Sequence, residues 1–148
     1  MKNQTLRQGY KRIQIQSGRQ EEIPESWHIA PLKDVIQAIK TGFASGERDE
    51  NGIVQLRMNN ISDSGTLAFD KFLRVPIPED VKQYDLRKDD VLFNNTNSLD
   101  LIGKSAIIGD HPDYTFSNHI TRIRTDTKKL VPYFLLLLFL KYRRQAIF

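Results

Sequence analysis

The chain has 148 residues, with 22 Lys and Arg, 18 Asp and Glu and no Cys, and its formal net charge is +4. This length predicts a single buried core, and the absence of cysteine excludes disulfides, thiolate nucleophiles and every zinc site that uses Cys. The longest apolar run, 130–140, is shorter than the roughly 20 residues of a membrane-spanning helix, and no secretory signal pattern is present. We therefore expect a cytoplasmic protein with no membrane contact.

The charges are unevenly distributed along the sequence. Residues 42–113 carry eight basic and 13 acidic side chains, whereas residues 117–148 carry seven basic and one acidic. A basic surplus at one end of the chain favours a partner with a phosphate backbone that meets one face only. Solvated Lys and Arg on a C-terminal helix would explain the same pattern, so charge alone leaves both interpretations open.

The first 22 residues predict an N-terminal arm. They contain no repeated apolar face, and only Ile13 and Ile15, which alternate with Gln, indicate a short strand. The apolar content then rises, so we predict a folded domain over 23–130. A final helical segment over 131–148 completes the chain.

The segment 31–41 has the pattern of an amphipathic helix. Pro31 suits a first helical turn, where its missing N–H would have no partner. Four apolar residues follow at helical spacing: Leu32, Val35, Ile36 and Ile39. Gly42 ends the pattern, and a Gly-bounded loop over 42–52 follows.

Five short apolar segments predict strands, and they are 53–58, 66–75, 91–93, 102–108 and 119–124. Polar, turn-rich segments separate them, and 79–88 predicts one helical turn. In the last strand, alternation predicts that Ile120 and Ile123 are buried and that Arg122 and Arg124 are less so.

The segment 131–148 predicts a helix whose first half is apolar nearly all round and therefore deeply buried. With the preceding elements it predicts an α+β fold. We expect a single domain with a curved, mostly antiparallel or mixed sheet, long loops and a helix near each end.

The motifs of catalysis and metal binding are incomplete. Gly103-Lys104-Ser105 resembles the end of a phosphate-binding loop, but Ser98 stands where that loop needs its first Gly. The three His lack metal-ligand spacing, and Asp89-Asp90 has no third carboxylate placed to complete a divalent-metal site. We predict no catalytic residue, no metal site and no cofactor, and therefore a protein that is not an enzyme.

Six motifs in a fixed order carry a resemblance to a known family. They are IPESW at 23–27, PLKDV at 31–35, VQLRMNNI at 54–61, DDVLFNNTNS at 89–98 with LIGKSA at 101–106, FSNHITRIR at 116–124, and PYFL at 132–135. In this order they resemble the target recognition domain in the specificity subunit of type I restriction–modification enzymes. Members of the family often have Gly where Asp89 stands, and a full subunit has two such domains joined by long paired helices.

The resemblance implies a non-catalytic module that chooses the DNA sequence for a multisubunit prokaryotic enzyme. Residues 23–130 would form the DNA target recognition domain, and 131–148 the truncated start of a spacer helix. The implied partners are double-stranded DNA, the methyltransferase (modification) subunits and, through them, the restriction subunit. One alternative is a truncated specificity-subunit remnant that docks on a partner protein without productive DNA binding. A small enzyme is a third, which no visible carboxylate or His cluster supports.

Side chains that read base edges or contact phosphates are Asn, Gln, Arg and Lys. Nine candidates for DNA contact follow: Arg48, Asn51, Asn59, Asn60, Asn95, Asn97, Lys104, Arg122 and Arg124. The asparagines would also be explained by local turn chemistry, which composition alone favours.

The loops differ in what the resemblance implies for them. The segment 94–106 recurs in members with different targets, which implies that much of it is structural and that loops 42–52, 76–88 and 109–117 choose the bases. We expect four basic residues on the DNA-facing side, namely Arg48, Lys104, Arg122 and Arg124.

Overall fold

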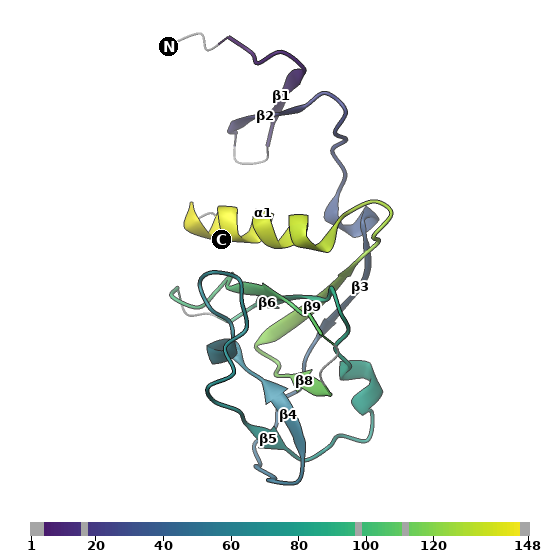
Figure 1. Ribbon diagram of the computed structural model, residues 1–148, viewed down its shortest axis with the longest axis vertical. Helices are drawn as coiled ribbons and strands as arrows, with labels where there is room; N and C mark the ends of the chain where they lie inside the picture. Colours follow the sequence, from purple (N-terminus) through teal and green to yellow (C-terminus); the bar gives the residue numbers. More distant parts are fainter. Residues whose placement is uncertain (1–4, 16–17, 97–98, 111–112, 146–148) are drawn as a thin grey trace. The chain divides into compact units, whose positions relative to one another are not determined.

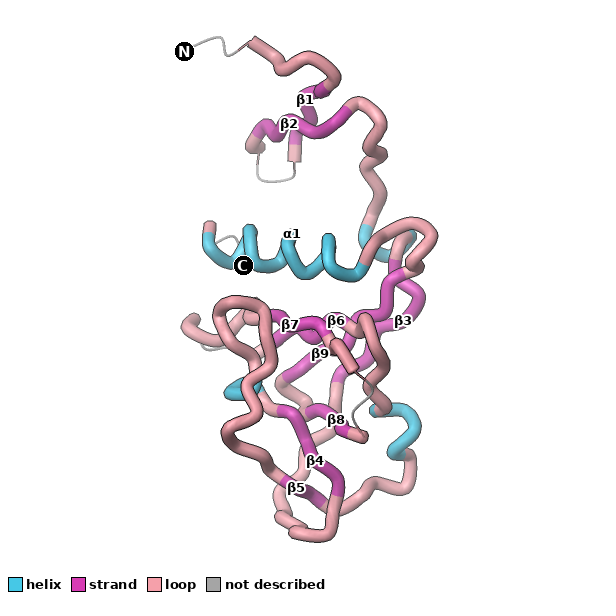
Figure 2. Tube along the Cα trace, in the orientation of Figure 1, coloured by secondary structure: helices cyan, strands magenta, loops and turns pink. Residues whose placement is uncertain are grey.

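The computed structural model describes residues 5–15, 18–96, 99–110 and 113–145. The chain divides into two compact units, residues 1–31 and residues 32–148. Figure 1 labels α1 and the strands other than β7, which Figure 2 labels. Each unit is described by itself below.

The first unit is a β-hairpin. β1 (Tyr10–Gln14) pairs antiparallel with β2 (Gln20–Pro24). The carboxylate of Glu22 accepts hydrogen bonds from Arg7 and Arg12, each at 3.3 Å, and the guanidinium of Arg7 lies 4.1 Å from the centre of the Tyr10 ring. Part of the predicted arm therefore forms paired strands, as the alternation near residue 13 indicated.

The second unit contains two sheets. Its four-stranded sheet is antiparallel throughout, with the order β3 (Ile36–Thr41), β9 (Ile120–Thr125), β6 (Val91–Asn94) and β7 (Ser105–Ile107). Its three-stranded sheet has the order β5 (Arg74–Val75), β4 (Ile53–Leu56) and β8 (Tyr114–Phe116). In this second sheet β5 is antiparallel to β4, whereas β8 is parallel to it.

Helical segments complete the second unit, and long loops link them to the strands (Figure 2). Three short 3-10 helices are η1 (Leu32–Asp34), η2 (Met58–Asn60) and η3 (Val81–Tyr84), and the α-helix is α1 (Pro132–Arg144). Within the described residues, no helix combines the length and the apolar character that crossing a membrane requires.

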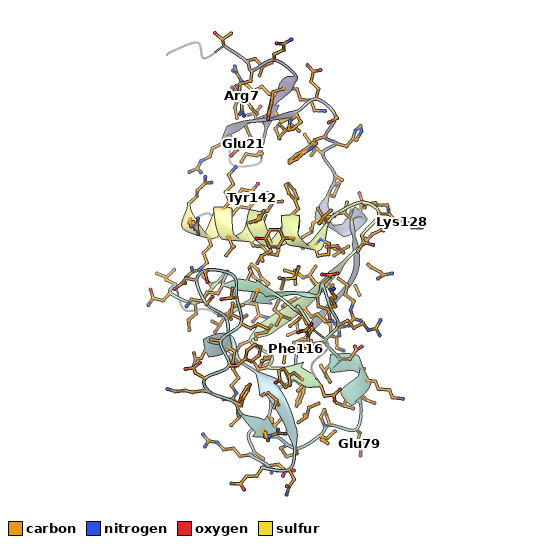
Figure 3. The ribbon with its side chains drawn as sticks, viewed as in Figure 1. Arg7, Glu21, Glu79, Phe116, Lys128 and Tyr142 are labelled. Carbon is orange, nitrogen blue, oxygen red and sulfur yellow. The ribbon has the colours of Figure 1, made fainter. Side chains whose placement is uncertain are left out.

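Two hydrophobic cores lie on opposite faces of the four-stranded sheet. Successive side chains of a strand point to opposite faces, so Val91 of β6 packs with Leu135 of α1, while Leu92 joins the core between the two sheets. Phe116 is fully buried in that second core and lies inside the body of the unit (Figure 3). The sheet therefore separates the helix from the three-stranded sheet.

A backbone junction at Phe43 joins the two sheets. The N–H of Gly42 donates to the carbonyl of Ile120 at 3.1 Å, and the N–H of Phe43 donates to the carbonyl of Phe116 at 3.3 Å. The N–H of Asn118 then donates to the carbonyl of Phe43 at 3.1 Å. A Cβ on Gly42 would lie only 2.2 Å from the Phe116 carbonyl oxygen, so the close approach requires glycine.

Two aspartates bind arginines between the sheet and the segment that precedes β6. Buried Asp90 accepts from Arg124 at both carboxylate oxygens, at 2.7 and 3.0 Å. Asp85 accepts from Arg122 at 3.0 Å and from Arg87 at 2.7 Å. Burial alone would raise the pKa of Asp85, but the guanidinium groups of Arg87 and Arg124 outweigh it and hold that pKa below its usual range.

The α+β class, the mostly antiparallel pairing and the C-terminal helix are confirmed. The predicted helix over 31–41 is wrong, because this segment forms η1 and then β3. Pairing with β9 overrides the helical spacing of the apolar residues, and the β-branched side chains of Val35, Ile36 and Ile39 fit a strand well.

Four of the predicted strands match β4, β6, β7 and β9 in position, and the helical turn in 79–88 is η3. The strand over 66–75 is wrong except at its last two residues. The side-chain amide of Asn60 donates to the carbonyls of Ala68 and Lys71, at 3.0 and 2.9 Å. The chain therefore curls around Asn60 instead of extending.

Two expectations about burial are wrong. Arg122 is only 5% exposed, because Asp85 binds its guanidinium and the ring of Phe116 lies 5.6 Å away. In the first half of α1, Tyr133 and Leu137 are exposed, so this half is buried on one side only.

Asp89 is a position where glycine should stabilise the fold. Its φ is 70°, in the left-handed region, and among the described residues it is the one non-glycine with positive φ. Relieving this conformation is worth about 1–2 kcal/mol, against about 0.5–1 kcal/mol for the added chain entropy of glycine. We therefore expect Asp89→Gly to raise the free energy of unfolding by about 0.5–1 kcal/mol in urea titration. Asp89→Ala should give no gain, and an Ala variant as stable as the Gly variant would contradict the explanation.

Removing the carboxylate of Asp90 should be strongly destabilising. Asp90→Ala leaves the guanidinium of Arg124, which is largely buried, without its bidentate partner. We expect a loss of about 3–5 kcal/mol in the free energy of unfolding. Asp70→Ala, at an exposed position, serves as the control and should change stability by less than about 0.5 kcal/mol. Equal effects of the two substitutions would show that the buried pair is unimportant.

Candidate nucleic-acid interface

A surface hollow of about 400 Å³ lies where the loop after β3 meets the segments that follow β4 and β8. We call it the hollow. Its lining comes from residues 44–46, 55, 57–59 and 117–119. Because β4 and β8 run parallel, their carboxyl ends lie on the same side of the sheet, and the polar residues after both strands converge there.

Backbone hydrogen bonds hold the walls of the hollow. Leu56 lies opposite Phe116 in the parallel register, and the N–H of Ser117 donates to the carbonyl of Leu56 at 2.9 Å. The Phe43 junction brings the loop 44–46 to the same place. The site is therefore built on main-chain contacts, and exposed side chains such as Arg57, Asn59 and Asn118 line it.

The lining of the hollow suits an anionic ligand. It includes the exposed Arg57 and His119, and none of the described residues that line it is Asp or Glu. Three other hollows of the second unit each have at least one Asp in their lining. Arg57 forms no ion pair within the described part of the chain, so its charge is free to meet a phosphate.

Three of the nine predicted contacts have exposed side chains, and one of the three lies in the hollow. Asn59 lines the hollow itself. Arg48 and Asn51 belong to the loop that also supplies residues 44–46, but their part of the loop leads into the first residue of β4, at the end of that strand away from the hollow. Arg48 has no ion pair among the described residues. The loop predicted to choose bases over 42–52 thus contributes directly to the hollow.

Three further candidates, Asn60, Arg122 and Arg124, bind other residues of the chain and so stabilise the fold. Asn60 is buried, and its Oδ1 also accepts from the backbone N–H of Arg57 at 2.9 Å. The guanidinium groups of Arg122 and Arg124 bind the two aspartates described above. That these three residues contact DNA stays a prediction. For either arginine, such a contact would have to replace an ion pair with Asp85 or Asp90.

The last three candidates lie in the 94–106 segment. Asn95 is half-buried beside the hollow, because its N–H donates to the carbonyl of His119 and its Nδ2 to Thr121 Oγ1, both at 2.9 Å. Lys104 pairs with Asp63 at 3.3 Å, and this hydrogen bond, with help from Arg143, lowers the pKa of Asp63. Asn97 lies outside the described residues.

Sequence analysis did not select several residues that the structure brings together, namely Gln55, Arg57, Ser117, Asn118 and His119. The available signal was a polar segment directly after an apolar strand, which occurs at both 57–60 and 117–119. This signal was not recognised, because β8 has only three residues and was not predicted. Without β8, the sequence does not predict its parallel pairing with β4. Among the described residues, no His, Asp and Glu group could hold a metal ion.

Comparison with known proteins gives a consistent result over nearly the whole chain. The family model for the type I restriction modification DNA specificity domain matches residues 24–148. A protein of Methanocaldococcus jannaschii named "Putative type I restriction enzyme MjaX specificity subunit" is 32% identical over 150 residues. That match covers 97% of this chain and 34% of the relative, so the chain spans about a third of the relative's length.

Solved structures share the fold at low sequence identity. The HsdS subunit from Thermoanaerobacter tengcongensis aligns with a TM-score of 0.55 and 13% identity, over 97% of this chain and 30% of that one. A chain from a study of complex assembly and conformational transition of the type I R-M system aligns with a TM-score of 0.53 and 16% identity. That alignment covers 95% of this chain and 29% of the other.

The glycine at the junction should be essential to the hollow. Gly42→Ala would force a Cβ against the Phe116 carbonyl, and we expect it to lower the free energy of unfolding by about 1–3 kcal/mol. Gly46→Ala is a matched control in the same loop, since a Cβ there meets nothing within 4 Å. Thermal or urea unfolding of both variants tests this, and a Gly42→Ala protein as stable as the Gly46→Ala protein would contradict it.

Proposed function

Because the chain belongs to the type I restriction modification DNA specificity domain family, we propose that it recognises a DNA sequence for such a restriction–modification system. The family match over residues 24–148 carries this proposal. The hollow supports it, because Arg57, Asn59 and Asn118 supply donors and acceptors of the kind that contact phosphates and base edges.

We propose that residues 23–130 act as the recognition domain and that 131–148 begin a spacer helix, with 1–22 as an arm. In this arrangement Arg57 and Arg48 contact the phosphate backbone, and Asn51 and Asn59 approach the bases. The exposure of all four side chains supports the assignment. For Arg57 and Asn59, the absence of acidic groups from the lining of the hollow also supports it. Asn95 and Lys104 lie at the edge of this surface, and Asn60, Arg122 and Arg124 hold the scaffold.

The proposed partners are double-stranded DNA, the methyltransferase subunits and, through them, the restriction subunit. The chain contributes target choice and no catalysis, and the chemistry belongs to the other subunits. A cytoplasmic location in a prokaryotic cell follows from this role, since the DNA and the partner subunits are there. The name of the Methanocaldococcus relative, a type I restriction enzyme specificity subunit, supports this assignment.

A second candidate function is a remnant that docks on a partner protein without productive DNA binding. The exposed Tyr133 and Leu137 of α1 favour it, because they offer an apolar helix surface. Size-exclusion chromatography with a purified modification subunit, combined with gel shifts with and without that subunit, separates the two functions. Complex formation without any DNA shift would favour the remnant.

Reversing the two free charges should weaken binding to every DNA sequence. For Arg48→Glu with Arg57→Glu we expect lower affinity for a random-sequence duplex, and a salt dependence whose slope falls by about one per lost phosphate contact. Fluorescence anisotropy of the chain with its modification subunits, over a series of salt concentrations, measures both. Lys128→Glu is the control, since Lys128 is exposed in the loop before α1 (Figure 3). An unchanged affinity and slope in the double variant would place the DNA elsewhere.

A further inference from the structure

Three buried polar atoms beneath the hollow lack a hydrogen-bond partner among the described residues. They are Gln55 Oε1, Thr115 Oγ1 and Ser117 Oγ, and their residues are 1%, 0% and 4% exposed. Buried polar atoms in native proteins are nearly always paired, either with protein groups or with bound water. Three neighbouring unpaired atoms therefore indicate that a group from outside the chain forms hydrogen bonds with them.

The three side chains share one face of the parallel β4–β8 pair. Gln55 lies opposite Thr115 in the register of the two strands. Ser117 follows Thr115 by two residues, so it points to the same face. Gln55 and Ser117 are also part of the lining of the hollow. Gln55 and Ser117 thus form the floor of the hollow, with Thr115 buried beside Gln55, and the exposed Arg57 and His119 form its rim.

The amide of Gln55 is held in one orientation. Its Nε2 donates to the carbonyl of Phe43 at 3.0 Å. Turning the amide round would place Oε1 against that carbonyl oxygen, and two acceptors would then face each other. Oε1 is therefore fixed as an acceptor that lacks a donor. The floor of the hollow requires an N–H or O–H group, whereas its rim presents the cationic Arg57.

Resting on the proposed function, we infer that the hollow recognises the exocyclic amino group of an adenine or a cytosine in the target DNA, through one bound water. In the major groove the amino donors are N6 of adenine and N4 of cytosine, while guanine and thymine present acceptors at the corresponding positions. A water is required because Oε1 has almost no exposed surface of its own. It donates to Gln55 Oε1 and to Ser117 Oγ, and it accepts from the amino group of the base.

This arrangement makes a distinct prediction about the target. Asn and Gln usually recognise adenine with both atoms of the amide, through N6 and N7. Here one N–H of the Gln55 amide is bound to Phe43, and the side chain is only 1% exposed, so the amide cannot contact N6 and N7 of adenine directly. Readout through Gln55 should therefore depend on the amino group and not on N7.

The experiment uses the full chain together with its modification subunits. Duplexes are first selected from a randomised pool to define the target, and affinities are then measured for analogues of the selected duplex. Each adenine is replaced by purine, which lacks the amino group, or by 7-deazaadenine, which lacks N7, and each cytosine by 2-pyrimidinone. We expect one position to lose about tenfold in affinity without the amino group, and 7-deazaadenine to bind normally there.

Variants of the floor connect this loss to the hollow. In Ser117→Ala and in Gln55→Met, the loss at that position should shrink to less than about twofold, which a double-mutant cycle between protein and base reports. Ser117→Ala removes only an unpaired hydroxyl, so it should fold even if Gln55→Met does not. Thr125→Val is the matched control, because Thr125 Oγ1 is also buried and unpaired but lies on β9. It should keep the full tenfold loss.

Two outcomes would overturn the inference, and they can be told apart. If Ser117→Ala keeps the full dependence on the amino group, the hollow holds a structural water only, and the proposed function stands. If the wild-type chain with its modification subunits selects no sequence at all, the proposed function itself fails and the inference fails with it.

Discussion

The backbone junction at Phe43 is the contact on which the second unit depends. The strands of the three-stranded sheet have only two to four residues, and strands this short are not stable by themselves. Hydrogen bonds through Phe43 and Ser117 connect them to the longer antiparallel sheet. Because Gly42 permits this approach, one small residue sets the distance between the sheets and, with it, the shape of the hollow.

Buried ion pairs decide which basic residues are available to a partner. The surplus of positive charge lies in residues 117–148, yet the guanidinium groups of Arg122 and Arg124 are buried against aspartates within the fold. Such pairs tolerate little change, since removing one partner leaves a poorly hydrated charge. The exposed Arg48 and Arg57 lie in a part of the sequence whose net charge is negative. Local geometry, and not the charge of a segment, therefore determines where an anion is attracted.

Sequence analysis succeeded where a short apolar segment was followed by clear turn residues, as at β4, β6 and β9, and where the order of motifs identified the family. It failed at β3, because the spacing of Val35, Ile36 and Ile39 fits a helix as well as a strand edge. It also missed β8, which has only three residues. The hollow depends on the pairing of β4 with β8. These strands are far apart in the sequence, so local sequence patterns cannot predict that they pair.

The parallel pairing of β4 with β8 has a consequence for how the chain tolerates insertions. Residues 57–113 must be closed into a loop before Leu56 can meet Phe116. The entropy lost in closing a flexible loop grows only with the logarithm of its length, at about 0.6 kcal/mol for each doubling. A surface loop such as 76–80 can therefore lengthen at little thermodynamic cost while the floor of the hollow keeps its geometry.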